Sequence, residues 1–218
     1  MINIVIIGHN EGDSILSMRD VLHGFPAQRI WVLDRCTDDS EKTLQELGEF
    51  YVKTDDSLTG RQTSCCRNLG LSLCHRDADV LFLDGDRFPV SGVLSGLETW
   101  DKDIALLLLE DEERNLVTDY HPYYGEVFNL FFSCGIFLKR KAVDAITTFQ
   151  HGELFRQDLQ ADWGIEDTYL GDVCYHLRLT AGIYRDCRLN GTFNKRKFDS
   201  PDVLARRLNE RKNLKVKW

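Results

Sequence analysis

Acidic side chains follow several short apolar runs of this 218-residue chain. The most informative run, residues 80–83, leads directly into Asp84, Gly85 and Asp86. Two aspartates two positions apart on a turn can point to the same side, and the intervening glycine lets the backbone pass close to a ligand. Such a pair can hold Mg2+ or Mn2+ while a diphosphate fills the remaining coordination positions of the metal. Asp-Gly is also a common turn dipeptide, so the pair alone favours a simple turn.

Polar groups follow two earlier apolar runs in the same way. The first run covers residues 2–7 and the second covers residues 29–33. In open α/β sheets, ligands bind beyond the carboxyl ends of the strands, so groups at neighbouring strand ends gather at one place. That neighbourhood favours a metal site over a simple turn at Asp84 and Asp86. The groups at the two earlier ends are Gly8, His9, Asn10 and Glu11, and then Asp34.

A second pair of acids, Glu166 and Asp167, follows Trp163 and Gly164. Acids at the start of a helix often only complement the helix dipole, and the pair alone leaves both interpretations open. An aromatic ring is a stacking surface for a sugar, and a carboxylate beside it can take a proton from a hydroxyl group. The tryptophan therefore favours a functional interpretation of the acids.

Arg67 lies on a predicted helix, residues 61–75, where its guanidinium would clamp a phosphate or hydrogen-bond a base. The alternative is a solvated helix face, which the spacing alone favours. Two common nucleotide-binding motifs are missing from the sequence. No Gly-x-Gly-x-x-Gly follows the first apolar run, and no Gly-x-x-x-x-Gly-Lys-Ser/Thr occurs, which argues against dinucleotide binding of the usual kind and against P-loop phosphoryl transfer.

The elements that position these groups alternate between apolar runs and amphipathic stretches. Several runs are continuously apolar and rich in Val, Ile and Leu, as in strands that are buried on both faces. The alternation implies an α/β fold with a largely parallel central sheet flanked by helices. The predicted strands are 2–8, 29–34, 50–54, 80–84 and 104–110, and the predicted helices are 13–22, 39–47, 61–75, 142–149 and 166–180.

The composition is that of a globular chain with one large domain. It is 43% apolar and 28% charged, with only four prolines, which argues against disorder and low complexity. The net charge of −8 argues against a general nucleic-acid coat. Seven cysteines without a Cys-x-x-Cys pair predict reduced thiols, and the lack of a Cys/His cluster with the usual ligand spacing disfavours a zinc site. With no leader-like start and no apolar run near the roughly 20 residues that span a bilayer, we expect a soluble, cytoplasmic protein without a transmembrane segment.

Charge is distributed unevenly along the chain. Residues 195–218 contain nine Lys or Arg and three Asp or Glu, so this segment carries +6 and the preceding 194 residues carry −14. Ser200, Pro201 and Asp202 have the residue types of a helix start. We therefore predict a main domain at 1–194 and a basic helical extension at 195–218.

Taken in order, these motifs resemble those of GT-A-fold glycosyltransferases, most closely glycosyltransferase family 2. Residues 4–11 and 32–40 resemble the first strand and the acidic second block of that family. Residues 66–70 resemble its Ala-Arg-Asn-x-Gly element, 79–86 its Asp-x-Asp strand, and 134–140 the strand before its acceptor-side helix. Residues 163–167 are similar to the Trp-Gly-x-Glu-Asp motif of galactosyltransferase-like members. The resemblance covers about residues 2–182 and implies a single GT-A domain.

The resemblance implies a donor site for a nucleotide-diphosphate sugar, with a UDP-sugar expected. Asp86 would coordinate Mn2+ or Mg2+, and Asp84 would contact the ribose or reach the metal through water. The cation would neutralise charge on the departing nucleoside diphosphate. The implied donor-binding residues are Gly8, His9, Asn10, Glu11, Asp34, Arg67, Asp84, Gly85 and Asp86, and the implied metal ligands are Asp86 and Asp84.

On the acceptor side, the resemblance implies that Asp167 deprotonates the acceptor hydroxyl, with Glu166 as the alternate base or an acceptor-binding group. Trp163 would pack on a sugar ring. The implied reaction is transfer of the sugar in a single displacement with inversion at the anomeric carbon. Two alternatives are a non-catalytic nucleotide-sugar-binding module and a sugar-phosphate nucleotidylyltransferase. The second is less favoured, because those enzymes carry a basic loop after the first strand and this loop is acidic.

Overall fold

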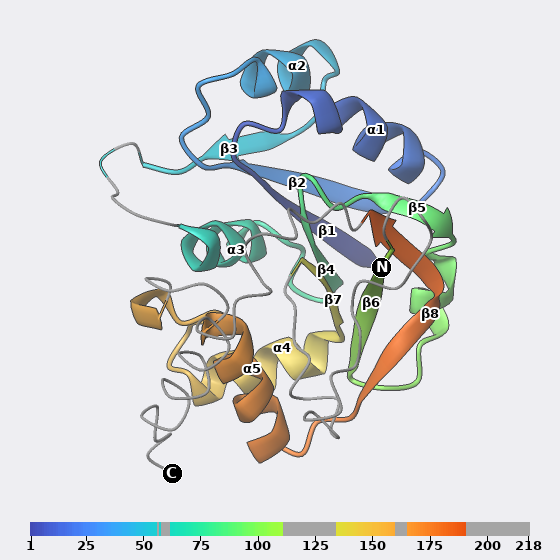
Figure 1. Ribbon diagram of the computed structural model, residues 1–218. Helices are drawn as coiled ribbons and strands as arrows, with labels where there is room; N and C mark the ends of the chain where they lie inside the picture. The colour runs from blue at the N-terminus through green and yellow to red at the C-terminus, as the bar shows by residue number, and fades with distance from the viewer. Residues whose placement is uncertain (56, 58–61, 111–133, 160–164, 191–218) are drawn as a thin grey trace, which may run out of the picture.

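The computed structural model describes residues 1–55, 57, 62–110, 134–159 and 165–190. Within these ranges an eight-stranded sheet is flanked by helices on both faces (Figure 1). The strands are β1 (Ile2–Gly8), β2 (Ala27–Leu33), β3 (Tyr51–Lys53), β4 (Asp79–Asp84), β5 (Pro89–Gly92), β6 (Ile104–Glu110), β7 (Gly135–Leu138) and β8 (Ala181–Asn190). The helices are α1 (Gly12–Leu22), α2 (Ser40–Glu46), α3 (Thr63–Ser72), α4 (Arg140–Phe149) and α5 (Ile165–His176), with short 3-10 helices η1 (Ser95–Thr99) and η3 (Gln157–Leu159).

The strand order is β3-β2-β1-β4-β7-β6-β8-β5, and the direction of pairing differs between the two halves of the sheet. Strands β3, β2, β1 and β4 are all parallel, as the alternating sequence pattern predicts. Strand β7 is antiparallel to both β4 and β6, and β5 is antiparallel to β8. Strand β8 is parallel to β6. The sheet is therefore mixed, and the expectation of a largely parallel sheet holds only for its first half.

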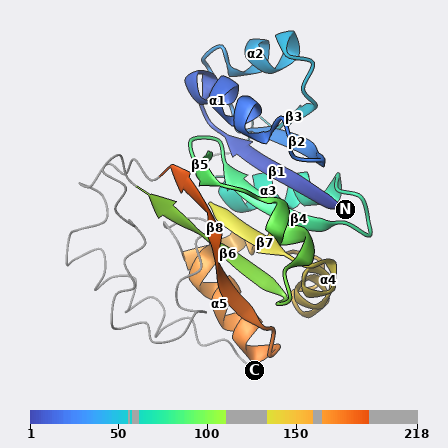
Figure 2. The same cartoon turned by 90° about the vertical axis from the view of Figure 1, so that its right-hand side faces the viewer.

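Strand β1 lies between two cores. Ile4 and Ile6 pack in the cluster that includes Ile15 and Met18 of α1. Val5 of β1 packs in the other cluster, with residues of α3, α4 and α5. Because successive side chains of a strand point to opposite faces, a strand between two helical layers is covered on both faces, and all seven residues of β1 are buried. Its one polar side chain, Asn3, is hydrogen-bonded to the side chain of Gln28 and to the N–H of His75. Figures 1 and 2 show α1 and α2 on one side of the sheet and α3, α4 and α5 on the other.

Some predicted elements differ from the observed ones. The predicted helix 166–180 ends at His176, and the chain then enters β8, which the sequence pattern does not predict. Strand β8 carries charged residues at Arg185, Asp186 and Arg188, and its register against β6 shifts between Leu107 and Leu108. Such a bulge breaks the alternation of a strand, so the pattern is lost. The predicted basic extension 195–218 and its helix start at Ser200 lie outside the described residues.

Candidate active site

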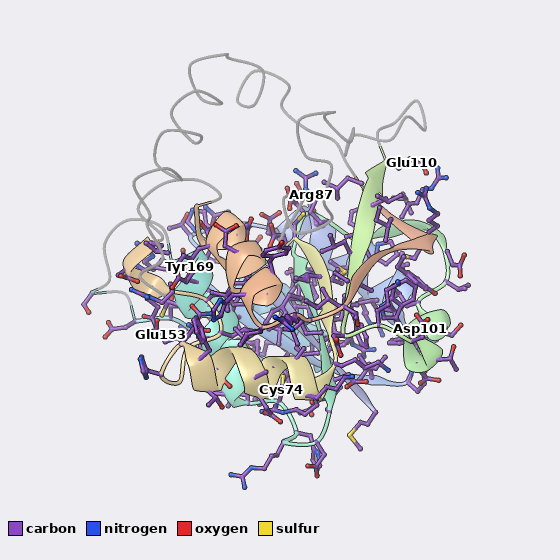
Figure 3. The ribbon with its side chains drawn as sticks, turned by 90° about the horizontal axis from the view of Figure 1, so that it is seen from below. Cys74, Arg87, Asp101, Glu110, Glu153 and Tyr169 are labelled. Atoms are coloured by element: carbon purple, nitrogen blue, oxygen red, sulfur yellow. The ribbon has the colours of Figure 1, made fainter. Side chains whose placement is uncertain are left out.

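The carboxyl ends of β1, β2 and β4 are joined by backbone hydrogen bonds at one edge of the sheet. The N–H of Gly85 donates to the carbonyl of Ile7 at 2.7 Å, and the N–H of Asp34 donates to the carbonyl of Gly8 at 2.8 Å. These bonds place the residues that follow each strand side by side. In Figure 3, Arg87 at this edge lies between α5, which carries Tyr169, and the end of β6, which carries Glu110.

Glu11, Asp84 and Asp86 form an acidic group at this edge. A Cβ atom on Gly85 would lie 3.0 Å from Cγ of Glu11 and 3.1 Å from the carbonyl oxygen of Ile7, so only glycine fits here without displacing a neighbour. Burial raises the pKa of Glu11 to about 7, with Asp86 and then Asp84 adding to the shift. Burial also raises the pKa of Asp86, and the charge of Asp84 acts in the same direction. This edge therefore concentrates negative charge that a cation would stabilise.

The carboxylates of this group suit a hard divalent cation whose coordination shell is completed by a bound ligand. Carboxylate oxygens are the side-chain ligands that Mg2+ and Mn2+ prefer, and Mg2+ is commonly held by one or two carboxylates together with substrate phosphates. Within the described ranges no group of three or more His, Cys, Asp or Glu side chains is placed to hold a metal ion. Asp86 has 46% of its side chain exposed, so it is accessible, and its neighbour Arg87 approaches it at 3.4 Å.

Arg67 links this edge to the acid pair on α5. Its Nη2 donates to Oδ1 of Asp84 at 2.8 Å. Its guanidinium also experiences the charges of Asp167 and Glu166 at the first turn of α5. The structure thus brings together groups that are 100 residues apart in the chain. Trp163, the remaining predicted residue of the acceptor side, lies outside the described residues.

Glu166 is a buried acid with an incomplete set of hydrogen bonds. Only 7% of the residue is exposed, and Oε1 accepts a hydrogen bond from the Thr63 hydroxyl at 3.4 Å. Oε2 is buried and has no hydrogen-bond partner among the residues that the structure describes. Burial raises the pKa of Glu166 to about 7, and the neighbouring charge of Asp167 adds to this shift. A proton is therefore readily exchanged at this position near neutral pH.

Asp34 follows the end of β2, and its carboxylate is already engaged by other side chains. Arg35 donates to it through Nε at 2.6 Å and through Nη2 at 2.8 Å, and the Thr54 hydroxyl donates to Oδ1 at 3.1 Å. Arg35 has a φ of 47°, in the left-handed region that non-glycine residues rarely adopt. A nucleotide that approaches Asp34 would therefore meet a carboxylate–guanidinium pair, which sequence reasoning missed.

His9 and Asn10 shape the loop between β1 and α1. A ring nitrogen of His9, Nδ1, lies 2.6 Å from the carbonyl oxygen of Asp34. The side-chain oxygen of Asn10 accepts hydrogen bonds from the N–H groups of Thr37 at 2.7 Å and Asp38 at 3.3 Å. Asn10 has a φ of 62°, a conformation that asparagine tolerates better than most residues. Both side chains tie the loop after β1 to the loop after β2.

Three contributors to the site could not be recognised from local motifs. Thr54 and Thr63 donate hydrogen bonds to Asp34 and Glu166, respectively. Phe155 lies beneath the guanidinium of Arg67, with the ring centroid 5.4 Å from Cζ. A threonine or phenylalanine carries no signal of its role until the fold shows its neighbour. Arg35 did carry a signal, since it directly follows Asp34 in the acidic block.

Solved structures of similar fold include S. aureus TarS 1-349, with a TM-score of 0.65 and 16% sequence identity over 87% of this chain and 59% of that chain. They also include glucosyl-3-phosphoglycerate synthase from Mycobacterium tuberculosis in complex with Mg2+ and UDP, with a TM-score of 0.50 and 18% identity over 66% and 58% of the two chains. The same synthase with Mn2+, UDP-glucose and phosphoglyceric acid gives a TM-score of 0.51 at 18% identity and the same coverage. This chain thus spans less than two-thirds of each of these structures.

At these identities the likeness shows the fold: a mixed α/β fold similar to that of GT-A glycosyltransferases. No protein-family model and no curated protein matches the sequence. None of the helices in the described ranges is long and apolar enough to cross a membrane.

Proposed function

We propose that this protein is a metal-dependent glycosyltransferase, which moves a sugar from a nucleotide-diphosphate sugar to an acceptor hydroxyl. The observation that carries the proposal is the link through Arg67 between Asp84, at the end of β4, and the acid pair on α5. A donor-side carboxylate and an acceptor-side base must lie close together for a single displacement. The similarity of the fold to GT-A glycosyltransferases supports the same reaction class.

On the donor side, Asp86 would hold Mn2+ or Mg2+, and Asp84 would contact the ribose or reach the metal through water. The raised pKa values of Glu11 and Asp86 support this assignment, because they report a concentration of negative charge. The cation, when bound, supplies Lewis-acid neutralisation of charge on the diphosphate leaving group. The protein's own task is to hold the diphosphate against the edge formed by β1 and β4, where Gly85 lets the backbone approach closely.

We propose UDP-sugar as the donor class. The synthase of similar fold was solved with UDP and with UDP-glucose, which supports a uridine nucleotide. The base would lie near the loops after β1 and β2, where Asn10 and Asp34 are located. These loops would position the nucleotide through Gly8, His9, Asn10, Glu11 and Asp34.

On the acceptor side, Asp167 would take the proton from the acceptor hydroxyl while the hydroxyl oxygen attacks the anomeric carbon. Glu166, deeper in the protein, would hold the acceptor or act as the alternate base. Trp163 would pack on the sugar. A single displacement with the base on the face opposite the leaving group inverts the anomeric configuration.

The test is UDP release from a panel of UDP-sugars in the presence of Mn2+. The proposal predicts donor-specific release that EDTA abolishes. If UDP binds measurably but no donor yields UDP, with or without added sugar acceptors, the protein is a binding module and the transferase proposal is wrong. Asp167→Asn is the internal control, because it should remove release and retain UDP binding.

A further inference from the structure

Arg67 is a cation buried between the carboxylates of the two sides of the proposed site. Only 3% of the residue is exposed. We propose that Arg67 is a positioning residue, which holds Asp84 in place relative to the acid pair Glu166 and Asp167, instead of binding the nucleotide itself. The inference rests on the proposed function, since it assigns Asp84 to the donor side and the pair to the acceptor side.

The surroundings of Arg67 fix its position. Its guanidinium packs on the ring of Phe155, and that ring meets Phe82 of β4 edge-on with centroids 5.1 Å apart. The neighbouring Asn68 holds the backbone of the same phenylalanine in both directions: Nδ2 donates to the Phe155 carbonyl at 2.7 Å, and Oδ1 accepts from its N–H at 3.0 Å. Leu154 donates a further N–H to the Asn68 oxygen at 3.2 Å. The side chain of Arg67, which projects from α3, is thus held against the segment before η3.

A guanidinium that is buried to this degree offers little surface to a nucleotide, but it can serve as a fixed reference for carboxylates. One of its nitrogens, Nη2, bonds Asp84 at 2.8 Å. Its Nε and Nη1 are buried and have no hydrogen-bond partner within the described residues, and Oε2 of Glu166 is in the same situation. Buried donors and acceptors are normally paired, so the spare nitrogens of Arg67 are suited to a carboxylate of the acid pair once the site is complete.

The charges around Arg67 also support a positioning role. One positive charge faces Asp84, Asp167 and Glu166. Burial alone would lower the pKa of Arg67, but the attraction of the three acids raises it, so the arginine stays charged. That fixed charge lowers the pKa of Glu166 against the opposing effects of burial and Asp167. Arg67 therefore favours the ionised state of the acids that would accept the acceptor proton.

The test compares Arg67→Met and Arg67→Lys with the wild type. With Arg67→Met we expect kcat to fall by about 100-fold or more, while the KM for the donor and the Kd of UDP with Mn2+ rise by less than about tenfold, because Asp86 still holds the cation. Arg67→Lys keeps the charge without the planar fork, so it should recover part of kcat. In Arg67→Met the rising limb of the plot of kcat against pH should move to higher pH, because the acids lose the positive charge that favours their ionised form.

Arg29→Met is the matched control. Arg29 forms a two-point ion pair with Glu49 at 3.0 Å, on β2 and outside the site, so its loss should leave kcat unchanged. A loss of UDP affinity in the Arg67 variants that accounts for their loss of kcat/KM would overturn the inference, because Arg67 would then be a nucleotide ligand. If Arg67→Met does not fold, the same comparison with Arg67→Lys decides the point.

A second readout separates this inference from the proposed function. Carboxyl 13C NMR titration of Glu166 requires no turnover, so it applies even if the wild type transfers no sugar. Removal of the positive charge in Arg67→Met should raise the pKa of Glu166 above its wild-type value of about 7. An unchanged titration would contradict the role of Arg67, whereas an inactive wild type with a shifted titration would contradict only the transferase proposal.

Discussion

Two acids of the candidate site, Glu11 and Glu166, have pKa values that the folded protein raises to about 7. Glu11 faces the carboxylates of Asp84 and Asp86, whereas Glu166 faces Asp167 and the cation of Arg67. Burial is the largest cause of the raised pKa in each case. Ionisation of either acid therefore destabilises the folded state, and a bound cation or substrate would reduce that destabilisation.

The first prediction concerns Glu11 and the pH dependence of stability. Its pKa rises from 4.5 in the unfolded chain to about 7 in the folded protein, so the folded state binds the proton more tightly. The contribution of Glu11 to the free energy of unfolding is therefore fully present below pH 4.5, and it is lost as the pH rises through 7. Glu11→Gln should remove this loss and gain on the order of 1–2 kcal/mol relative to the wild type between pH 4.5 and pH 8, less than the full shift because the side chain is partly exposed.

Urea unfolding of the two proteins across this pH range, in EDTA, provides the measurement. Glu98→Gln, on the exposed surface of η1, controls for the loss of a negative charge. Parallel stability curves for the wild type and Glu11→Gln would show that Glu11 does not bind its proton more tightly in the folded state.

The second prediction separates the two acids of α5. Asp167→Asn should lower kcat by about 100- to 10,000-fold, because a general base contributes that much, and should leave the Kd of UDP unchanged. Glu166→Gln keeps the size of the side chain and should have the smaller effect on kcat and the larger effect on KM for the acceptor. Steady-state kinetics on both variants decides the assignment, and turnover that survives in Asp167→Asn would exclude Asp167 as the base.

At the scale of elements, the site depends on how closely α3 approaches the sheet. A Cβ atom on Gly70 of α3 would lie 2.3 Å from Cγ1 of Val5 and 3.2 Å from Cγ2 of Val32, so the helix rests directly on β1 and β2. Arg67 lies one turn earlier on the same helix, so this contact also sets its depth. The sequence predicted the helix from its apolar residues, but the need for glycine at this position appears only in the packed structure.

The third prediction follows from this contact. Gly70→Ala should destabilise the protein by about 1–3 kcal/mol, because valine is stiff and the added methyl group must displace the helix from the sheet. It should also lower activity, since Arg67 would move away from Asp84. Gly24→Ala is the matched control, because a Cβ atom there meets no other atom within 4 Å. Equal urea midpoints for the two variants would contradict the close packing of α3.

At the scale of the whole molecule, local pattern predicts the parallel half of the sheet, but it does not predict the strand directions of the other half. Continuous apolar runs predicted β1 and β6 at their observed bounds. An apolar run has the same pattern whether its neighbouring strand is parallel or antiparallel, so the antiparallel pairing of β7 with β4 was not predictable. The motifs also predicted acids at the ends of β1, β2 and β4 and on α5, but the ion pairs of Asp34 with Arg35 and of Asp84 with Arg67 join side chains only in the folded protein.

We propose that the edge formed by β1, β2 and β4 binds a nucleoside diphosphate through a divalent cation held at Asp86. Calorimetric titration of UDP, with Mn2+ and with EDTA, tests it most directly in the wild type, in Asp86→Ala, and in Asp101→Ala as a control at an exposed site away from this edge. We predict Mn2+-dependent binding in the wild type and the control, and none in Asp86→Ala. Equal UDP affinity in all three proteins, or binding that is unchanged by EDTA, would contradict the claim.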